Sequence, residues 1–162
     1  SEKWGNLVSG WWFDGCYYVD KMYNFPEPPN FKSFAESARK GNPESIVAFN
    51  AGVKVPVVSL TEYEDYTAGE IDGALPVSGI EPSVIPLKRF LNNAQFHILT
   101  FIGGCWGKGE PRFPDEFLIS YTKYINSFGG AITYDFPPPD EDGNIPFPFL
   151  NQLSNLAKAV SV

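Results

Sequence analysis

Short apolar runs alternate with amphipathic segments along this chain. The apolar runs predict buried strands at 7–13, 45–49, 63–68, 95–102 and 131–134, of which 63–68 has the weakest pattern. Apolar residues recur at helical spacing in three segments, which predict helices at 31–40, 115–128 and 149–160. A short helical turn is expected at 87–92. Strands that alternate with helices, without hairpin signals between them, are typical of a parallel sheet with crossover helices.

The alternation leaves two α/β architectures open. Five such strands can form an open, doubly wound sheet or part of a closed barrel. The 162 residues fit one domain, and 43% of them are hydrophobic, which is enough for a substantial core. No strand is followed by a glycine-rich phosphate loop of the GxGxxG or GxxxxGK[ST] type. Nucleotide binding therefore lacks its usual sequence support.

Polar side chains and a tryptophan follow the predicted strands at the points where they end. In order along the chain these are Asp14, Asn50, Glu70, Trp106 and Asp135. Function in parallel β/α folds gathers at the C-terminal ends of the strands. A pair of carboxylates without a metal suits glycoside hydrolysis, in which one attacks or stabilises the anomeric carbon and the other protonates the leaving oxygen. Glu64 and Asp65 are expected to be solvated or ion-paired.

Charge and composition exclude several classes of partner. The formal net charge is −7, the pI is near 4.6, and no basic run is present, so we expect no nucleic-acid partner. No apolar stretch reaches the roughly 18 residues of a membrane helix, so no membrane partner is expected. Aromatic residues make up 16% of the chain. Flat rings serve cores in most cases, and they also cover the C–H face of a bound sugar.

Cysteine and histidine chemistry has little support. Cys16 and Cys105 form no disulfide framework and lack metal-ligand spacing. The single histidine, His97, lies in an apolar run and is expected to be a structural residue of a strand. We therefore expect neither a zinc site within this chain nor a cofactor.

Four segments, in order, resemble the α-L-fucosidases of glycoside hydrolase family 29. Trp11–Gly15 (WWFDG) resembles the tryptophan-x-aspartate strand that carries the nucleophile, and Glu70 follows Gly69 where that family places its acid/base glutamate. The segment 105–107 (CWG) resembles the family's serine-tryptophan-glycine segment. The closing signature, in which paired glycines open a last strand and an Asp-Gly-x-Ile loop follows, is matched by 129–134 and 142–146.

The resemblance implies a fold and a domain organisation. Residues 1–162 would form the C-terminal part, about five β/α units, of a parallel (β/α)8 TIM-type barrel. The nucleophile strand is about the fourth of eight in such enzymes, whereas here it ends at Asp14. The first three strands are therefore expected to be missing from this chain.

The resemblance also implies roles for particular residues. Asp14 would be the nucleophile and Glu70 the acid/base of a retaining, α-L-fucosidase-like hydrolase that removes a terminal sugar. Trp12, Tyr17, Asn50 and Trp106 would bind the carbohydrate substrate. Two other interpretations stay open: a non-catalytic carbohydrate-binding or structural remnant of a barrel, and a different α/β hydrolase that uses Asp14 in another way. A different α/β hydrolase loses support if the carboxylates of Asp14 and Glu70 converge in space.

Overall fold

The computed structural model describes residues 1–18, 21, 23–77, 85 and 87–161. Three α-helices are present in this part of the chain: α1 (Phe31–Arg39), α2 (Asp115–Ser127) and α3 (Phe147–Val160). The strands are β1 (Gly10–Phe13), β2 (Ile46–Phe49), β3 (Glu70–Ile71), β4 (Phe90–Leu91), β5 (Ala94–Gln95), β6 (His97–Phe101) and β7 (Ala131–Asp135). A 3-10 turn, η1 (Gly5–Leu7), precedes β1. The predicted first strand therefore begins three residues later than expected.

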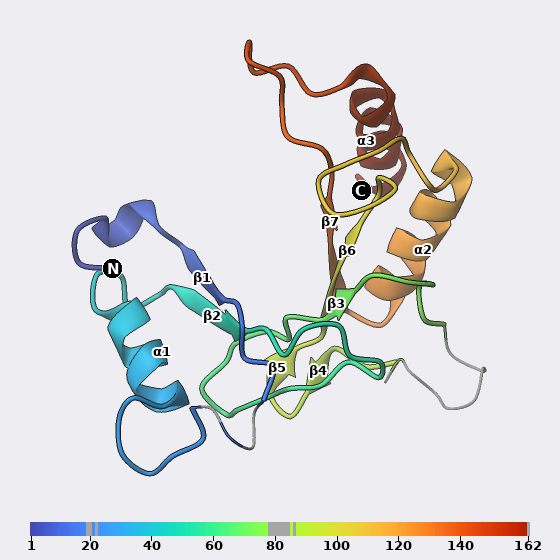
Figure 1. The fold of residues 1–162 in the computed structure, drawn as a ribbon. Coiled ribbons are helices and arrows are strands. Elements are labelled where there is room, and N and C mark those ends of the chain that lie inside the picture. The colour runs from blue at the N-terminus through green and yellow to red at the C-terminus, as the bar shows by residue number, and fades with distance from the viewer. Residues whose placement is uncertain (19–20, 22, 78–84, 86, 162) are drawn as a thin grey trace.

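The principal strands are parallel, which confirms the predicted α/β class. β1 pairs with β2, and β6 lies between β3 and β7 in a second sheet, with every pairing parallel. Figure 1 shows β1 and β2 toward the middle of the molecule with α1 outside them, and β6 and β7 with α2 on their outer side. Within each sheet the parallel strands follow chain order, as they do in barrel-type windings.

An irregular segment joins the two sheets, where the sequence predicted a strand at 63–68. The Asp65 N–H donates to the Val47 carbonyl on one side (2.8 Å), and the Gln95 N–H donates to the Asp65 carbonyl on the other (2.8 Å). Side chains complete the pairing, because the Val47 N–H donates to Oδ2 of Asp65 (2.7 Å). The regular strand begins only at Glu70, so the predicted bounds of this strand are wrong.

The β/α repeat is incomplete, which corrects the expectation of about five β/α units. In the described part of the chain, helices follow β1, β6 and β7, but none follows β2 or β3. The predicted helical turn at 87–92 is instead part of the antiparallel β4–β5 hairpin. Asn92 and Asn93 form its turn with φ values of 49° and 72°. Asparagine tolerates this left-handed conformation better than most residues, which allows a tight hairpin without glycine.

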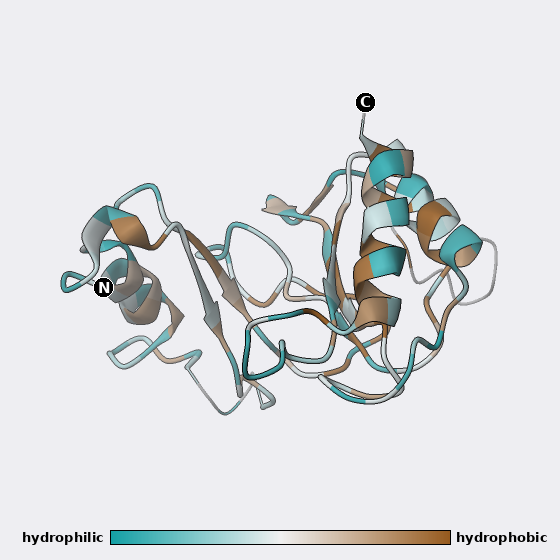
Figure 2. Cartoon of the chain, turned by 90° about the horizontal axis from the view of Figure 1, so that it is seen from above, coloured by the Kyte–Doolittle hydropathy of each residue, from teal (hydrophilic) through white to brown (hydrophobic). Residues whose placement is uncertain are grey.

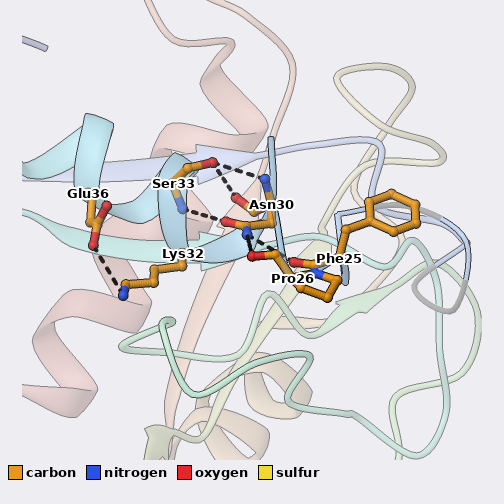
Figure 3. Close-up of polar contacts among 6 residues, drawn as sticks. All are labelled: Phe25, Pro26, Asn30, Lys32, Ser33 and Glu36. Carbon is orange, nitrogen blue, oxygen red and sulfur yellow. Dashed lines mark hydrogen bonds and ion pairs between the residues drawn. The ribbon is translucent and has the colours of Figure 1, made fainter. Parts of the chain in front are cut away.

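The N-terminus of α1 is fixed by a reciprocal cap. The Asn30 side chain accepts a hydrogen bond from the Ser33 N–H (2.9 Å), and Oγ of Ser33 accepts one from the Asn30 N–H (2.9 Å) (Figure 3). This capping box satisfies two backbone donors at the end of the helix. The Asn30 amide also donates to the Phe25 carbonyl (2.9 Å), which ties the loop after β1 to the helix. Lys32 and Glu36 form an exposed i,i+4 ion pair (3.9 Å) that adds little.

The helices pack through apolar faces, as the periodicity predicted. Phe31, Ala35 and Ala38 of α1 are buried against Val47 and Phe49 of β2. Figure 2 shows hydrophobic and hydrophilic residues alternating around α2 and α3, whose buried residues Leu118 and Phe149 meet in a second cluster. None of the helices in the described residues is long and apolar enough to cross a membrane. The core therefore lies on the outer faces of the strands, between them and the helices.

Candidate active site

Asp14 lies directly after β1, at the C-terminal end of the strand. One of its carboxylate oxygens, Oδ1, accepts hydrogen bonds from the Gly15 N–H (2.8 Å), from Nδ2 of Asn50 (2.9 Å) and, at long range, from the Tyr17 hydroxyl (3.5 Å). The other oxygen, Oδ2, has no hydrogen bond to any described residue. The Asp14 side chain is exposed. Asp14 is therefore a carboxylate with one oxygen anchored and one free.

Asn50 occupies the corresponding position after β2 and contacts two carboxylates. Its Nδ2 donates to Oδ1 of Asp14 (2.9 Å) and to Oε2 of Glu70 (2.7 Å). Its Oδ1 accepts a hydrogen bond from the Gly52 N–H (3.0 Å). This set of partners fixes the orientation of the amide, because the carboxylates need a donor and the Gly52 N–H needs an acceptor. Asn50 is only 3% exposed.

Glu70 is the first residue of β3, beside β6, so the prediction that it follows the end of a strand is wrong. It pairs in register with Leu99, and the preceding residue, Gly69, approaches β6 so closely that a Cβ there would collide with the His97 carbonyl oxygen. Gly69 also has φ +63°, which other residues rarely adopt. Glycine at position 69 thus allows the chain to bring Glu70 against Asn50. Oε2 of Glu70 is held by Asn50, and Oε1 has no hydrogen bond to a described residue.

The two carboxylates come together at one edge of the structure. Because Oδ1 of Asp14 and Oε2 of Glu70 bind the same nitrogen, they are at most about 5.6 Å apart, the sum of the two hydrogen-bond lengths. Retaining glycosidases place their two carboxyl groups about 5–5.5 Å apart, and inverting ones about 6.5–9.5 Å apart. The limit of about 5.6 Å applies to the two anchored oxygens and places the two carboxyl groups side by side.

Tyr17 and Gly52 flank this pair. Tyr17 is 50% exposed, and the negative charge of Asp14 raises the pKa of its phenol. Its ring lies over Gly52, where an added Cβ would be 2.9 Å from the ring. Gly52 has φ +76°, so both the space and the backbone conformation require glycine there. The contact brings the ring of a predicted sugar-binding residue to the carboxylates, at a position that solvent reaches.

Trp12 lies deeper on the same face of β1 as Asp14, two positions earlier. Its ring centroid is 6.4 Å from that of Tyr66 and 6.4 Å from that of His97. Trp12 is half-buried, and the ring contacts recorded for it are with Tyr66 and His97. Its predicted role in substrate binding stays a prediction.

Trp106 is held in a separate loop at the end of β6. Its ring stacks edge-on against Phe101, with 4.7 Å between centroids. The adjacent Gly107 N–H donates to Oδ2 of Asp135 at the end of β7 (2.9 Å). The structure brings four of the predicted site residues together: Asp14, Tyr17, Asn50 and Glu70. The Trp106 ring instead packs against Phe101. Asp135, which the sequence placed at a strand end without a role, anchors this loop.

Cys16 and Glu64 are buried titratable groups. Burial, and then the charge of Asp14, raise the pKa of the Cys16 thiol to about 11, so this thiol stays neutral at ordinary pH. Glu64 is 5% exposed, and desolvation raises its pKa to about 7. The expectation that Glu64 is solvated or ion-paired is therefore wrong, because the side chain is buried and its Oε1 accepts a hydrogen bond from the Leu60 N–H (2.7 Å). Asp65 does pair with Arg39 (2.6 Å), as expected.

His97 is a buried strand residue, as the apolar run around it predicted. Its Nδ1 faces the carbonyls of Thr67 (2.9 Å) and Ala68 (3.2 Å), and its Nε2 faces the Thr133 hydroxyl (2.8 Å). Nδ1 must carry the proton to face two carbonyls, and burial lowers the pKa of the ring. The described residues contain no group of three or more His, Cys, Asp or Glu side chains that could hold a metal ion. Cys16 and Cys105 are free thiols.

Small hollows border the two carboxylates. A hollow of about 10 Å³ borders Asn50 and Glu70, and one of about 60 Å³ borders Asp14 and Cys16. A larger hollow of about 460 Å³ lies on the inner face of the strands, along Tyr66, His97 and Thr133. Of the two carboxylates, Asp14 is exposed to solvent and Glu70 is half-buried.

Comparison with known proteins identifies the fold. No protein-family model matches the chain, and a search of the curated proteins finds no match. Among solved structures, the chain resembles the endo-fucoidan hydrolase MfFcnA4 of glycoside hydrolase family 107, with a TM-score of 0.71 and 21% identity over 96% of this chain and 28% of that one. The endo-fucoidan hydrolase P5AFcnA of the same family matches with a TM-score of 0.64 and 15% identity, over 99% of this chain and 53% of that one.

A third solved structure is an α-L-fucosidase. AlfC from Lactobacillus casei, in complex with its α-L-fucose product, matches with a TM-score of 0.54 and 16% identity over 94% of this chain and 39% of that one. The chain spans 28% of the length of MfFcnA4. The fold is therefore one found in fucose-cleaving glycoside hydrolases. The similarity extends to hydrolases of family 107 and is not specific to family 29.

Proposed function

We propose that this chain carries the catalytic carboxylates of a retaining glycoside hydrolase that cleaves α-L-fucosyl linkages. The observation that carries the proposal is the convergence of Asp14 and Glu70 on one amide nitrogen, which places Oδ1 of Asp14 and Oε2 of Glu70 within about 5.6 Å of each other. Two carboxyl groups that lie side by side suit double displacement, in which no water needs to fit between the carboxylate and the anomeric carbon in the first step. The convergence counts against a different hydrolase that uses Asp14 without Glu70.

The proposed double displacement uses the carboxylate oxygens that have no hydrogen bond to the described residues. Oδ2 of Asp14 attacks the anomeric carbon and forms a glycosyl ester, while the protonated carboxyl of Glu70 gives its proton to the leaving oxygen. Glu70 then removes a proton from water, whose oxygen displaces Asp14 and restores the carboxylate. The sugar anomer is retained because the anomeric carbon is inverted twice. Each carboxylate has one oxygen without a hydrogen bond to the described residues, and those oxygens are available for these steps.

The substrate class rests on two independent similarities. The WWFDG strand, Glu70 after Gly69, and the closing signature resemble family 29 α-L-fucosidases. The structural neighbours are endo-fucoidan hydrolases and an α-L-fucosidase, which act on fucose-containing substrates by name. We therefore propose an α-L-fucosidase-like activity on a terminal sugar, with the parallel strands as consecutive strands of a (β/α)8 barrel. A non-catalytic remnant is less favoured, because the proteins with this fold are hydrolases.

An endo-acting enzyme is the second candidate, and one feature favours it. Tyr17 and Tyr18, on the loop after Asp14, are 50% and 68% exposed. Exposed rings in an open site suit a chain of sugars that extends past the cleaved bond, and the named neighbours include endo-fucoidan hydrolases. The two candidates differ in the linkage they cleave and share the same pair of carboxylates.

Time-resolved proton NMR tests the proposal. The full-length protein is mixed with p-nitrophenyl α-L-fucoside or with a fucoidan oligosaccharide, and the anomer formed first is identified. We expect the α-anomer of fucose, or of the new reducing end, to appear first. Hydrolysis of the fucoside alone identifies the exo-acting enzyme, and hydrolysis of the oligosaccharide alone identifies the endo-acting one. Initial release of the β-anomer contradicts a retaining mechanism.

A further inference from the structure

Asn50 is held in one place by every polar group it has. Its N–H donates to the Phe13 carbonyl (2.8 Å) and its carbonyl accepts from the Cys16 N–H (2.8 Å), so its backbone bonds to residues on either side of Asp14. Its Oδ1 accepts from the Gly52 N–H (3.0 Å). Both hydrogens of Nδ2 remain for Asp14 and Glu70. No N–H of Asn50 is left to bind a sugar.

The amide nitrogen is suited to separating two carboxylates. The two N–H bonds of a primary amide diverge, so each points to a different acceptor, and the nitrogen lies between two groups of like charge. Without donors between them, two neighbouring carboxylates disfavour each other's ionised form. An asparagine that only formed the turn with Gly52 would need the Oδ1 bond alone. The two further bonds from Nδ2 require a second explanation.

The hydrogen bonds around the pair are unequal. The anchored oxygen of Asp14 accepts from Gly15, Asn50 and Tyr17, whereas among the described residues that of Glu70 accepts from Asn50 alone. The place of the Glu70 carboxyl group therefore depends on Asn50 more than that of Asp14 does.

We propose that Asn50 is a positioning residue, which sets the separation of Asp14 and Glu70 and directs their free oxygens toward the substrate. This inference rests on the proposed function and replaces a substrate-binding role for Asn50. Gly52 supports this arrangement in two ways. Its N–H orients the Asn50 amide, and the absence of a side chain at position 52 leaves space for the Tyr17 ring. The catalytic residues remain Asp14 and Glu70, and Asn50 acts through them.

Two variants separate positioning from folding. Asn50→Asp keeps the shape of the side chain and an acceptor for the Gly52 N–H, but removes both donors. Asn50→Ala removes the donors and the acceptor. Asn126→Asp, on the exposed face of α2, makes the same chemical change away from the site and serves as the matched control. Asp14→Asn tests the proposed function separately.

Steady-state kinetics on the hydrolysed substrate provide the first readout. We expect kcat of Asn50→Asp to fall roughly a hundredfold or more while KM changes less than about threefold, because a positioning contact acts in the transition state. Asn126→Asp stays at the wild-type values. A raised KM with an unchanged kcat in Asn50→Asp overturns the proposal and restores a substrate-binding role. An active Asp14→Asn enzyme instead contradicts the proposed function.

Crystal structures of the wild type and of Asn50→Asp provide a readout that needs no activity. We expect the carboxyl of Asp14 or Glu70 to turn away in the variant, because a third acceptor replaces the shared donor. If both carboxyl groups keep their wild-type separation and orientation, Asn50 does not position them and the proposal is wrong. This result is decisive even if the wild-type protein hydrolyses neither substrate.

Discussion

Thr67 and His97 are joined by three hydrogen bonds in the interior of the fold. Oγ1 of Thr67 accepts from the His97 N–H (2.9 Å) and donates to the His97 carbonyl (2.8 Å), and the Thr67 carbonyl faces Nδ1 of the imidazole (2.9 Å). The Thr67 hydroxyl thus pairs with the backbone N–H and carbonyl of His97, which the backbone of a neighbouring strand would otherwise do. The connection holds the segment that leads to Glu70 against the sheet.

Replacement of the Thr67 hydroxyl should therefore destabilise the fold. Thr67→Val keeps the shape of the side chain but leaves the buried N–H and carbonyl of His97 without a partner. Each unpaired buried group costs about 1–3 kcal/mol, so we expect the free energy of unfolding, measured by urea denaturation, to fall by about 2–5 kcal/mol. Thr61→Val is the control, since within the described residues the Thr61 hydroxyl makes one long contact, to the Tyr63 N–H (3.4 Å). An equal loss of unfolding free energy in the two variants would show that the hydrogen bonds of the Thr67 hydroxyl do not stabilise the fold.

The side-chain bonds of Asp65 and Thr67 explain why the third strand could not be located from the sequence. A pattern of apolar positions predicts backbone ladders, but Asp65 and Thr67 replace ladder bonds with side-chain bonds. Regular pairing starts only at Glu70. The strands with continuous apolar runs, β2 and β6, and all three helices were predicted within a few residues, because burial on one face produces the periodicity.

The candidate site was partly predictable. The rule that strand ends gather function placed Asp14, Asn50 and Glu70 together, and Asn50 contacts both carboxylates. Asp14 and Asn50 do follow strands, whereas Glu70 begins β3, so the rule placed it beside the others for the wrong reason. That one amide would donate to both carboxylates depends on the register of neighbouring strands, which no local pattern reveals. The burial of Glu64 was also missed, because an acidic residue in an irregular segment has no periodicity that predicts its environment.

Glu64 should make stability depend on pH. Burial raises the pKa of its carboxyl from 4.5 to about 7 in the folded protein. Between these values the unfolded chain has lost the proton and the folded chain keeps it, so stability falls as pH rises through this window. One pKa unit corresponds to about 1.4 kcal/mol, which sets the limiting slope per pH unit from this group.

Glu64→Gln tests this dependence, because glutamine cannot ionise and keeps an acceptor for the Leu60 N–H. We expect the variant to gain stability relative to wild type as pH rises from about 4.5 to about 7, in urea denaturations at intervals across the range. Glu62→Gln, on an exposed neighbour, is the control. A difference between Glu64→Gln and wild type that stays constant with pH would mean that Glu64 ionises in the folded protein as it does in the unfolded chain.

Trp106 provides a test of the predicted sugar-binding residues. Its ring is held against Phe101 by a loop that Asp135 anchors. If the ring covers a bound sugar, Trp106→Ala should raise KM about tenfold, which corresponds to about 1.4 kcal/mol of lost binding, with little change in kcat. Trp4→Ala, at a partly exposed ring beside Trp11, is the control. Unchanged kinetics in Trp106→Ala would remove this residue from the substrate site.

The catalytic role of Asp14 is the central claim, and chemical rescue measures it most directly. Asp14→Gly removes the nucleophile and leaves space for an external anion, and Asp72→Gly changes an exposed aspartate after β3 as the control. With p-nitrophenyl α-L-fucoside, or with the oligosaccharide if that is the substrate, we expect Asp14→Gly to lose about a thousandfold or more in kcat/KM. Sodium azide should restore part of this rate and give a fucosyl azide of inverted configuration, because azide then attacks the anomeric carbon once in place of Asp14. An Asp14→Gly enzyme that keeps near-wild-type kcat/KM without azide would contradict the claim.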